Sequence, residues 1–315
     1  MSISEVAINA DLSRLSATQT VINEVLAQWP EHARFLKSRF RDVSASMTAT
    51  TEEVAALVLK LAGPRLAEMC KNYCWMCQNF LEDEFHFRRT GEYRLKSFDE
   101  AYRHVYSKRE YMSRYIDGIL LSQVLWHNHA AALHHFITDF LRAVPAGSSY
   151  LEVGPGHGLF TYFAARSGHF QRLVGWDVSA ASIQATQSAL DVFGIGDRCE
   201  LVQCNILDRG DSPADQFDRI VISEVLEHLE DPLQALQTLF HVARPDARIF
   251  INVPVNSPAP DHIYLWRTPE DAVETMRSAG FEIDSVVLAP GTGYTSERAR
   301  KMEVTISCLI TAVRP

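Results

Sequence analysis

Apolar and polar positions follow two different periods along the chain, and the change lies near residue 145. Before it, apolar residues recur at spacings of three and four, which is typical of helices that bury one face. After residue 148, short apolar runs alternate with helical segments, which predicts strands joined by crossover helices. The pattern therefore predicts an α-helical domain at 1–145 and an α/β domain at 146–315. The clearest helical segments are 24–29, 52–61, 64–80 and 113–144.

Local signals suggest where some of these helices begin and end. Thr50-Thr51-Glu52-Glu53 resembles a capping-box start, and Gly63-Pro64 favours a break between two helices. The apolar stripe of 113–144 predicts one long helical segment with four histidines in its middle. One of them, His129, lies beside that stripe. It is either a core histidine or a general base that faces a pocket.

Composition indicates how many domains the chain can form and in which cellular compartment it lies. The chain has 315 residues, and 47% of them are hydrophobic. This length and composition are sufficient to form the cores of two domains. No apolar run reaches the ~20 residues of a membrane span, and the N-terminus lacks the pattern of a secretory signal. Six cysteines in such a chain indicate reduced thiols, so we expect a cytoplasmic protein.

The charge balance argues against nucleic acid as a partner. Residues 1–145 hold 17 basic and 17 acidic side chains, so the whole net charge of −9 lies in the second half. Binding to a phosphate backbone relies on a basic excess that neither half has. We expect a small-molecule substrate, and the sequence does not predict the oligomeric state.

Three cysteines, Cys70, Cys74 and Cys77, have the spacing of a cluster-binding motif. Thiolates at this spacing hold iron–sulfur clusters in radical S-adenosylmethionine enzymes, which is one alternative function. The same residues fall on one stripe of a helix with Leu66 and Leu81, where free cysteine behaves as a small apolar residue. The stripe favours core packing.

A glycine loop opens the α/β half. The apolar run 150–153 predicts a buried strand, Leu159 begins a helix, and Gly154, Gly156 and Gly158 lie between them. Glycines let this backbone turn tightly and approach a ligand, while the helix N-terminus offers free N–H groups. The next strand ends at Asp177, which is well placed to accept hydrogen bonds from two ribose hydroxyls.

The run Glu-x-Gly-x-Gly-x-Gly from Glu152 resembles motif I of the class I S-adenosylmethionine-dependent methyltransferases. The resemblance covers residues 148–315 and implies a doubly wound, seven-stranded Rossmann-like sheet. The family's final antiparallel hairpin fits strands at 281–288 and 302–312, with 291–301 as an extended connection. The cofactor, S-adenosylmethionine, is then expected to contact these residues: Glu152, Gly154, Gly156, Gly158, Asp177, Val178, Asn205, Ile206, Glu224 and Tyr115.

The segment after the fourth strand, Glu224-Val225-Leu226-Glu227-His228, resembles the Glu-x-x-Glu-His run of metal-dependent family members. Those members include ubiquinone-pathway O-methyltransferases and small-RNA 2′-O-methyltransferases. The resemblance implies that Glu224, Glu227 and His228 bind a divalent ion, with His262 from beyond the fifth strand. Such an ion would lower the pKa of a substrate oxygen. Alternatively, these side chains cap the helix or line the pocket without metal.

The hypothesis is therefore a small-molecule methyltransferase of natural-product metabolism that methylates oxygen or carbon. Candidate catalytic residues are His228, His262 and His129, and the helical domain is expected to form a lid over the substrate. Besides the radical enzyme, two alternatives stay open. They are an RNA-modifying methyltransferase and a noncatalytic cofactor-binding partner of another enzyme.

Overall fold

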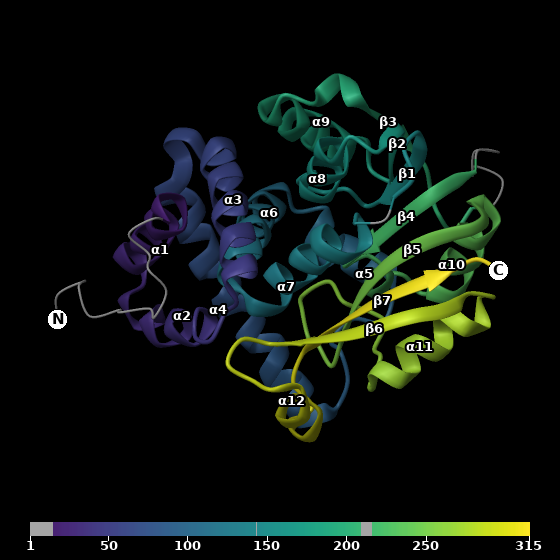
Figure 1. The fold of residues 1–315 in the computed structure, drawn as a ribbon. Coiled ribbons are helices and arrows are strands. Elements are labelled where there is room, and N and C mark those ends of the chain that lie inside the picture. Colours follow the sequence, from purple (N-terminus) through teal and green to yellow (C-terminus); the bar gives the residue numbers. More distant parts are fainter. Residues whose placement is uncertain (1–14, 143, 209–215) are drawn as a thin grey trace.

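The computed structural model describes residues 15–142, 144–208 and 216–315, and Figure 1 shows its ribbon. A seven-stranded sheet with the order β3-β2-β1-β4-β5-β7-β6 forms the centre of the second half. Strands β1 to β5 are parallel, whereas β7 runs antiparallel to both β5 and β6. This confirms the predicted doubly wound sheet with its antiparallel end. The strands are β1 (Ser148–Val153), β2 (Phe170–Asp177), β3 (Cys199–Gln203), β4 (Phe217–Ser223), β5 (Ala243–Val255), β6 (Glu282–Pro290) and β7 (Ile306–Val313).

The helices fall into two groups. Those before the sheet are α1 (Ser16–Gln28), α2 (Ala33–Arg39), α3 (Ala45–Ala62), α4 (Leu66–Thr90), α5 (Phe98–Ala101), α6 (Arg109–Leu125) and α7 (His127–His135), with π-helical turns η5 (Tyr102–Tyr106) and η6 (Phe136–Phe140). Those within the α/β part are α8 (Leu159–Ser167), α9 (Ala180–Phe193), α10 (Pro232–Val242), α11 (Pro269–Ser278) and α12 (Ser296–Met302), with a short 3₁₀ turn η8 (Leu226–His228). No described helix has the length and apolarity needed to span a membrane.

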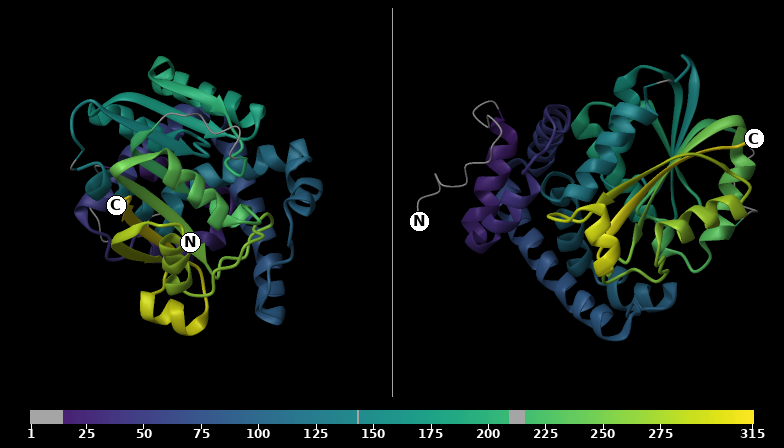
Figure 2. Two further views of the ribbon diagram at one scale, coloured as in Figure 1. Left: turned by 90° about the vertical axis from the view of Figure 1, so that its right-hand side faces the viewer. Right: turned by 60° about the horizontal axis from the view of Figure 1, so that its bottom comes forward.

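Two apolar cores lie on the two faces of the sheet. One face packs against α10 and α11. The other packs against α8, α9 and the helical part, so a continuous core joins the two halves of the chain. At this junction the Phe136 and Phe140 rings of η6 lie 5.8 and 5.7 Å from the Phe250 ring of β5. The two views in Figure 2 show the helical part beside the sheet, with the long helix α4 along one side.

The predicted start of the second helix is wrong. Helix α3 begins at Ala45, where the Ser44 hydroxyl accepts a hydrogen bond from the Met47 amide at 3.1 Å. The Glu52 carboxylate instead accepts hydrogen bonds from the backbone amides of Ala17 and Thr18, at 2.9 and 2.8 Å. A glutamate inside α3 therefore caps the N-terminus of α1.

The single long helix predicted at 113–144 is interrupted. Trp126 has an extended backbone (φ −107°, ψ 137°) and separates α6 from α7. Its indole nitrogen donates to the Tyr73 hydroxyl at 2.9 Å, and the His127 amide donates to the Thr292 hydroxyl at 2.9 Å. Residues that are distant in sequence therefore accept hydrogen bonds from the polar groups at this break. The continuous apolar stripe did not predict it. The Gly63 break was predicted correctly and has a φ of 51°.

The cysteine stripe belongs to the helical core. Cys70 and Cys74 are buried on α4, and burial raises the pKa of Cys70 to about 12. A thiol in such surroundings stays protonated and does not ligate metal readily. Leu81 departs from the predicted stripe, since it is exposed where α4 extends beyond the core.

The connection between the last two strands is also not fully extended. It contains helix α12, whose N-terminus is capped by the Thr295 hydroxyl accepting from the Arg298 amide at 3.2 Å. Strand β7 accordingly begins at Ile306 rather than at Met302. Helix α9 has a local cap, since the Ser179 hydroxyl accepts from the Ser182 amide at 3.3 Å, and the helix ends at Phe193.

Candidate functional site

The sheet brings the candidate residues to one edge. Strand β1 is flanked by β2 on one side and β4 on the other, so the crossover connections run in opposite directions from this point. In doubly wound sheets ligands bind at the carboxyl ends of the strands at such a switch point. The glycine loop follows β1 and Glu224 follows β4, so both candidate groups lie at this edge.

The glycine loop requires glycine at two positions for steric as well as conformational reasons. Gly154 and Gly158 have φ values of 67° and 71°, which disfavour residues with a Cβ. A Cβ on Gly154 would lie 2.6 Å from a methyl group of Val225, and one on Gly158 would lie 2.8 Å from a methyl group of Leu190. The backbone therefore passes close to β4 and α9, and it leaves the start of α8 facing the sheet edge.

Glu152 lies beneath this loop and is only 3% exposed. Its Oε2 accepts hydrogen bonds from the Thr161 hydroxyl at 2.5 Å and the Tyr150 hydroxyl at 3.1 Å. Burial raises the pKa of Glu152 to about 7, and these hydroxyl donors oppose the shift. In this structure the carboxylate ties β1 to α8.

The other predicted cofactor residues lie at the ends of β2 and β3. The Asp177 Oδ1 accepts from the Ser179 amide at 2.9 Å, and burial raises the pKa of this carboxyl group. The Asn205 Oδ1 accepts from the Leu207 amide at 3.1 Å. Val178 is 54% exposed beside Asp177, whereas Ile206 is buried. Two side chains with acceptor oxygens, Asp177 and Asn205, and the exposed Val178 thus lie at the ends of β2 and β3.

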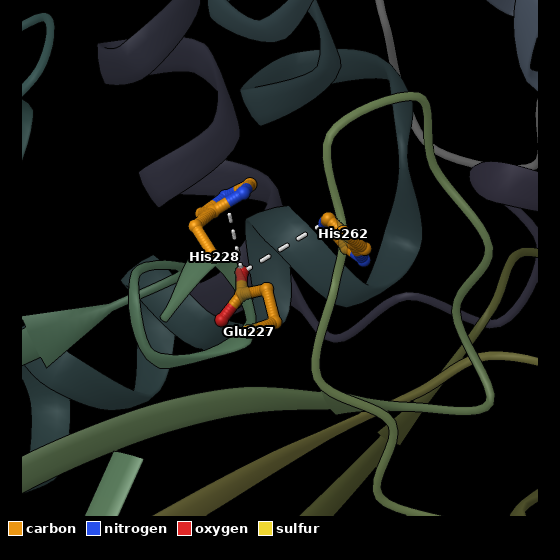
Figure 3. A group of neighbouring side chains, drawn as sticks. All are labelled: Glu227, His228 and His262. Carbon is orange, nitrogen blue, oxygen red and sulfur yellow. Dashed lines mark ion pairs between the residues drawn. The ribbon is translucent and has the colours of Figure 1, made fainter. Parts of the chain in front are cut away.

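Three residues of the proposed metal set come together in Figure 3. The Nε2 atoms of His228 and His262 lie 3.7 and 3.9 Å from Oε1 of Glu227, and all three ligand atoms are within 4.8 Å of one another. Glu227 and His228 come from η8, and His262 comes from the loop after β5. Glu224 is not part of this group. Its Oε1 accepts from the Asn252 side-chain amide at 3.0 Å.

The Glu227 side chain is 0% exposed, and among the described residues no group donates to its oxygens with hydrogen-bond geometry, while the Glu224 carboxyl group is its close neighbour. Burial and the neighbouring Glu224 raise the pKa of Glu227 well above its ordinary value. Burial also raises the pKa of Glu224 to about 7 and lowers that of His262 to about 4. The pocket therefore disfavours the bare Glu227 carboxylate and keeps the His262 imidazole neutral.

Both imidazoles turn the same nitrogen toward Glu227. The Nδ1 of His262 lies 2.7 Å from the Ser257 carbonyl oxygen, and the Nδ1 of His228 lies 3.1 Å from the Asp261 carbonyl oxygen. A carbonyl only accepts, so each Nδ1 donates its proton and each Nε2 keeps a lone pair. This is how metal-ligating histidines are oriented in proteins.

A family model described as "Methyltransferase domain" matches residues 125–286, just over half of the chain. The chain belongs to this methyltransferase family. The cofactor of this family is S-adenosylmethionine. The glycine loop and Asp177 offer the backbone turn and the ribose acceptor that this cofactor needs, so the residues present fit it.

Curated relatives match this methyltransferase over part of their length. The tRNA 5-carboxymethoxyuridine methyltransferase of Escherichia coli (strain K12) is 29% identical over 128 residues, covering 41% of this chain and 46% of that protein. The ubiquinone biosynthesis O-methyltransferase of Hahella chejuensis is 29% identical over 116 residues, covering 36% and 47%. The chain thus spans about half the length of these relatives.

A solved structure shows the same fold over more of the chain. The pyocyanin biosynthetic protein PhzM superimposes with a TM-score of 0.50 at 18% identity, covering 88% of this chain and 75% of that one. At this identity the likeness concerns the fold alone.

The helical part of the methyltransferase reaches the site with residues that the sequence did not single out. The Tyr93 ring packs 5.9 Å from the His262 ring, and the Tyr93 hydroxyl accepts from the Ser257 amide at 2.9 Å. Tyr115, predicted to touch the cofactor, donates to the Asp261 carboxylate at 2.9 Å. Asp261 could have been noticed because it precedes His262. Tyr93 lies in a run of aromatic and arginine side chains, 85–94, whose commoner explanation is a solvated turn.

His129 is buried near these residues. Its Nδ1 lies 2.7 Å from the Ser122 hydroxyl, and its ring lies 5.0 Å from the Trp126 ring. Burial lowers the pKa of His129 to about 3, with further contributions from His157 and His262. The imidazole is therefore neutral at pH 7 and lies within electrostatic reach of the candidate cation site.

Proposed function

We propose that this methyltransferase transfers a methyl group from S-adenosylmethionine to an oxygen atom of a small organic acceptor. We further propose that Glu227, His228 and His262 hold a divalent cation beside that oxygen. The observation that carries the proposal is the buried Glu227 carboxylate, which has no hydrogen-bond donor and faces two imidazole nitrogens.

The chemistry of this donor set fits a cation. An ionised carboxylate that is buried without a partner costs several kcal/mol. A cation between Glu227, His228 and His262 would remove that cost and use the three free ligand atoms. One carboxylate and two imidazoles suit Mn²⁺, Fe²⁺, Co²⁺ or Zn²⁺, and three protein ligands leave positions open for a substrate oxygen.

Each group has a separate task in the proposed reaction. S-adenosylmethionine supplies a methyl group on a cationic sulfur, and a bound cation lowers the pKa of an acceptor hydroxyl. The chain itself holds the reactants in line. The glycine loop and Asp177 fix the cofactor from the β1 and β2 side, while the Glu227 group fixes the acceptor from the β4 side. Such alignment is the main contribution of a protein to a displacement reaction.

The helical part, residues 1–145, supports a small acceptor because it covers the site. Tyr93, Tyr106 and Tyr115 reach across from this part to the loop that carries His262. Further aromatic rings continue from there, since Phe80 lies 6.0 Å from Tyr115 and 5.7 Å from Trp126. We propose that this wall forms the lid, excludes water and favours a hydroxylated aromatic acceptor.

An RNA acceptor is the second candidate, because one relative is named for a tRNA substrate. The absence of a basic excess in either half of the chain favours the small molecule. The two are separated by incubating the protein with methyl-labelled S-adenosylmethionine and either total tRNA or a panel of hydroxylated aromatic compounds. We expect label in the small molecules and none in tRNA, and the reverse result would replace the proposal.

The cation is tested in the same assay. Dialysis against a chelator should reduce turnover at least tenfold, and Mn²⁺ or Zn²⁺ should restore it. Calorimetry with S-adenosylhomocysteine is the control, because cofactor binding does not involve the Glu227 group. Full activity in chelator-treated protein that still binds the cofactor product would show that the cation role is wrong.

A further inference from the structure

We propose that Asp261 is a positioning residue that sets the tautomer of His228, and that Tyr106 and Tyr115 fix Asp261 from the helical part. The inference rests on the proposed function, because it explains how one of the three ligand atoms becomes available. Asp261 itself is not one of the three clustered ligands.

The Asp261 side chain is buried, with 2% exposure, and both carboxylate oxygens have a donor. The Tyr115 hydroxyl of α6 donates to Oδ1 at 2.9 Å, and the Tyr106 hydroxyl of η5 donates to Oδ2 at 3.2 Å. Unlike Glu227, this carboxylate is complete without a cation. Its two partners lie 155 and 146 residues away in the chain, so the contact joins the helical part to the loop after β5.

Three oxygen atoms surround the Nδ1 of His228. They are the Asp261 carbonyl oxygen at 3.1 Å, the Tyr106 hydroxyl at 3.2 Å and the Asp261 Oδ2 at 3.6 Å. A neutral imidazole carries one N–H, and this arrangement places it at Nδ1. The Nε2 lone pair then faces Glu227, as ligation requires.

The tyrosine hydroxyl is the atom through which Asp261 acts. A hydroxyl has one proton, so while Tyr106 donates to the Asp261 carboxylate it can only accept from His228. Without that carboxylate, the Tyr106 proton is free to point at Nδ1. His228 would then carry its own proton on Nε2, where it faces Glu227 and blocks a cation. The Asp261 carboxylate thus fixes the positions of two protons, that of the Tyr106 hydroxyl and that on Nδ1 of His228.

His262 provides an internal comparison. Its Nδ1 donates to the Ser257 carbonyl at 2.7 Å, whereas the carbonyl that faces the His228 Nδ1 is farther away, at 3.1 Å, and shares that nitrogen with the Tyr106 hydroxyl. A change at Asp261 should therefore alter the tautomer of His228 and leave that of His262 as it is. A general loosening of the site would affect both.

The direct test is NMR of cation-free protein labelled with ¹⁵N-histidine, at a pH where imidazole is neutral. Long-range ¹H–¹⁵N correlations distinguish the two tautomers, and His228→Gln assigns the His228 signals. We expect the Nδ1–H form at both histidines in the wild type. In Asp261→Asn we expect His228 to shift to the Nε2–H form while His262 stays unchanged. An Nε2–H tautomer of His228 in the wild type overturns the inference, whether or not the variant folds.

Calorimetry with Co²⁺ gives the functional consequence. Asp261→Asn should weaken Co²⁺ binding roughly 10- to 100-fold, which is usual for the loss of such an orienting partner. Asp117→Asn is the matched control, because Asp117 is a buried carboxylate bonded to Asn72 and Arg65, away from the histidines. Equal weakening in both variants would overturn the positioning role. If the wild type binds no Co²⁺, the cation proposal fails, and the NMR result still decides what Asp261 does to His228.

Discussion

Two buried glutamates at the same edge of the sheet have opposite surroundings. Glu152 of β1 accepts hydrogen bonds from the Thr161 and Tyr150 hydroxyls, whereas Glu227 of η8 has no donor at either oxygen. Burial raises the pKa of both carboxyl groups. One carboxylate is thus completed by the chain and holds the cofactor loop together. We propose that the other is completed by a bound divalent cation. The presence or absence of hydrogen-bond donors thus distinguishes the structural role of Glu152 from the binding role that we propose for Glu227.

The largest effect is expected from Glu227→Gln. The amide keeps the shape but cannot supply an anionic ligand, so divalent-cation affinity should fall more than 100-fold and methyl transfer should fall with it. Calorimetry with Mn²⁺ and a labelled-methyl assay measure the two effects. Glu152→Gln is the matched control and should bind the cation like the wild type, and equal losses in the two variants would contradict the comparison.

Removal of either imidazole should affect turnover more than cofactor binding. We expect His228→Ala and His262→Ala to lower kcat at least tenfold, because each removes a proposed ligand. Affinity for S-adenosylmethionine should stay within about twofold by calorimetry, since the glycine loop and Asp177, the main proposed cofactor contacts, lie on the β1 and β2 side. Full activity in both variants would show that the site is misassigned.

Asp177→Ala should have the converse effect. Loss of an acceptor for two ribose hydroxyls should weaken S-adenosylmethionine binding by roughly 100-fold or more, because two hydrogen bonds to a charged group are lost and each contributes about 1.5–3 kcal/mol. Cation affinity should not change. The measurement is calorimetry with each ligand separately, and an unaltered cofactor affinity would exclude the ribose role.

The smallest effect concerns the pH dependence of stability. Folding raises the pKa of Glu152 from 4.5 to about 7, so the folded protein holds this proton more tightly than the unfolded chain. The resulting stabilisation is fully present below pH 4.5 and is lost as pH rises through 7, by roughly 3 kcal/mol in total. Glu152→Gln should lack this decline, because an amide does not titrate in this range, and its oxygen can still accept from both hydroxyls. Urea unfolding of both proteins between pH 5 and 8 measures the difference, and parallel curves would contradict the prediction.

Much of the fold could be predicted because its signals are local. The glycines after β1, the Ser179 cap of α9 and the alternating strands all depend on residues next to one another in the chain. The break at Trp126 could not be predicted, because its partners Tyr73 and Thr292 are distant in sequence. The Ser44 cap was missed because the later threonines and glutamates offered a stronger pattern.

In the candidate site too, some features have a local sequence signal and others depend on contacts between distant residues. The resemblance to metal-dependent family members implied that Glu224, Glu227 and His228 form a ligand set, and the fold brings His262 to two of these three residues. It does not bring Glu224 into the group, because Asn252 holds that carboxylate at 3.0 Å. The contributions of Tyr93 and Tyr106 depend on how the helical part packs, which no local pattern records. The domain boundary at residue 145 stays a prediction.

The most direct test is anomalous diffraction from crystals of the protein grown with S-adenosylhomocysteine and soaked in Mn²⁺. The account predicts one manganese peak between Oε1 of Glu227 and the Nε2 atoms of His228 and His262, beside the cofactor product in the glycine loop. A loop occupied by the cofactor product with no manganese at these three atoms would contradict it.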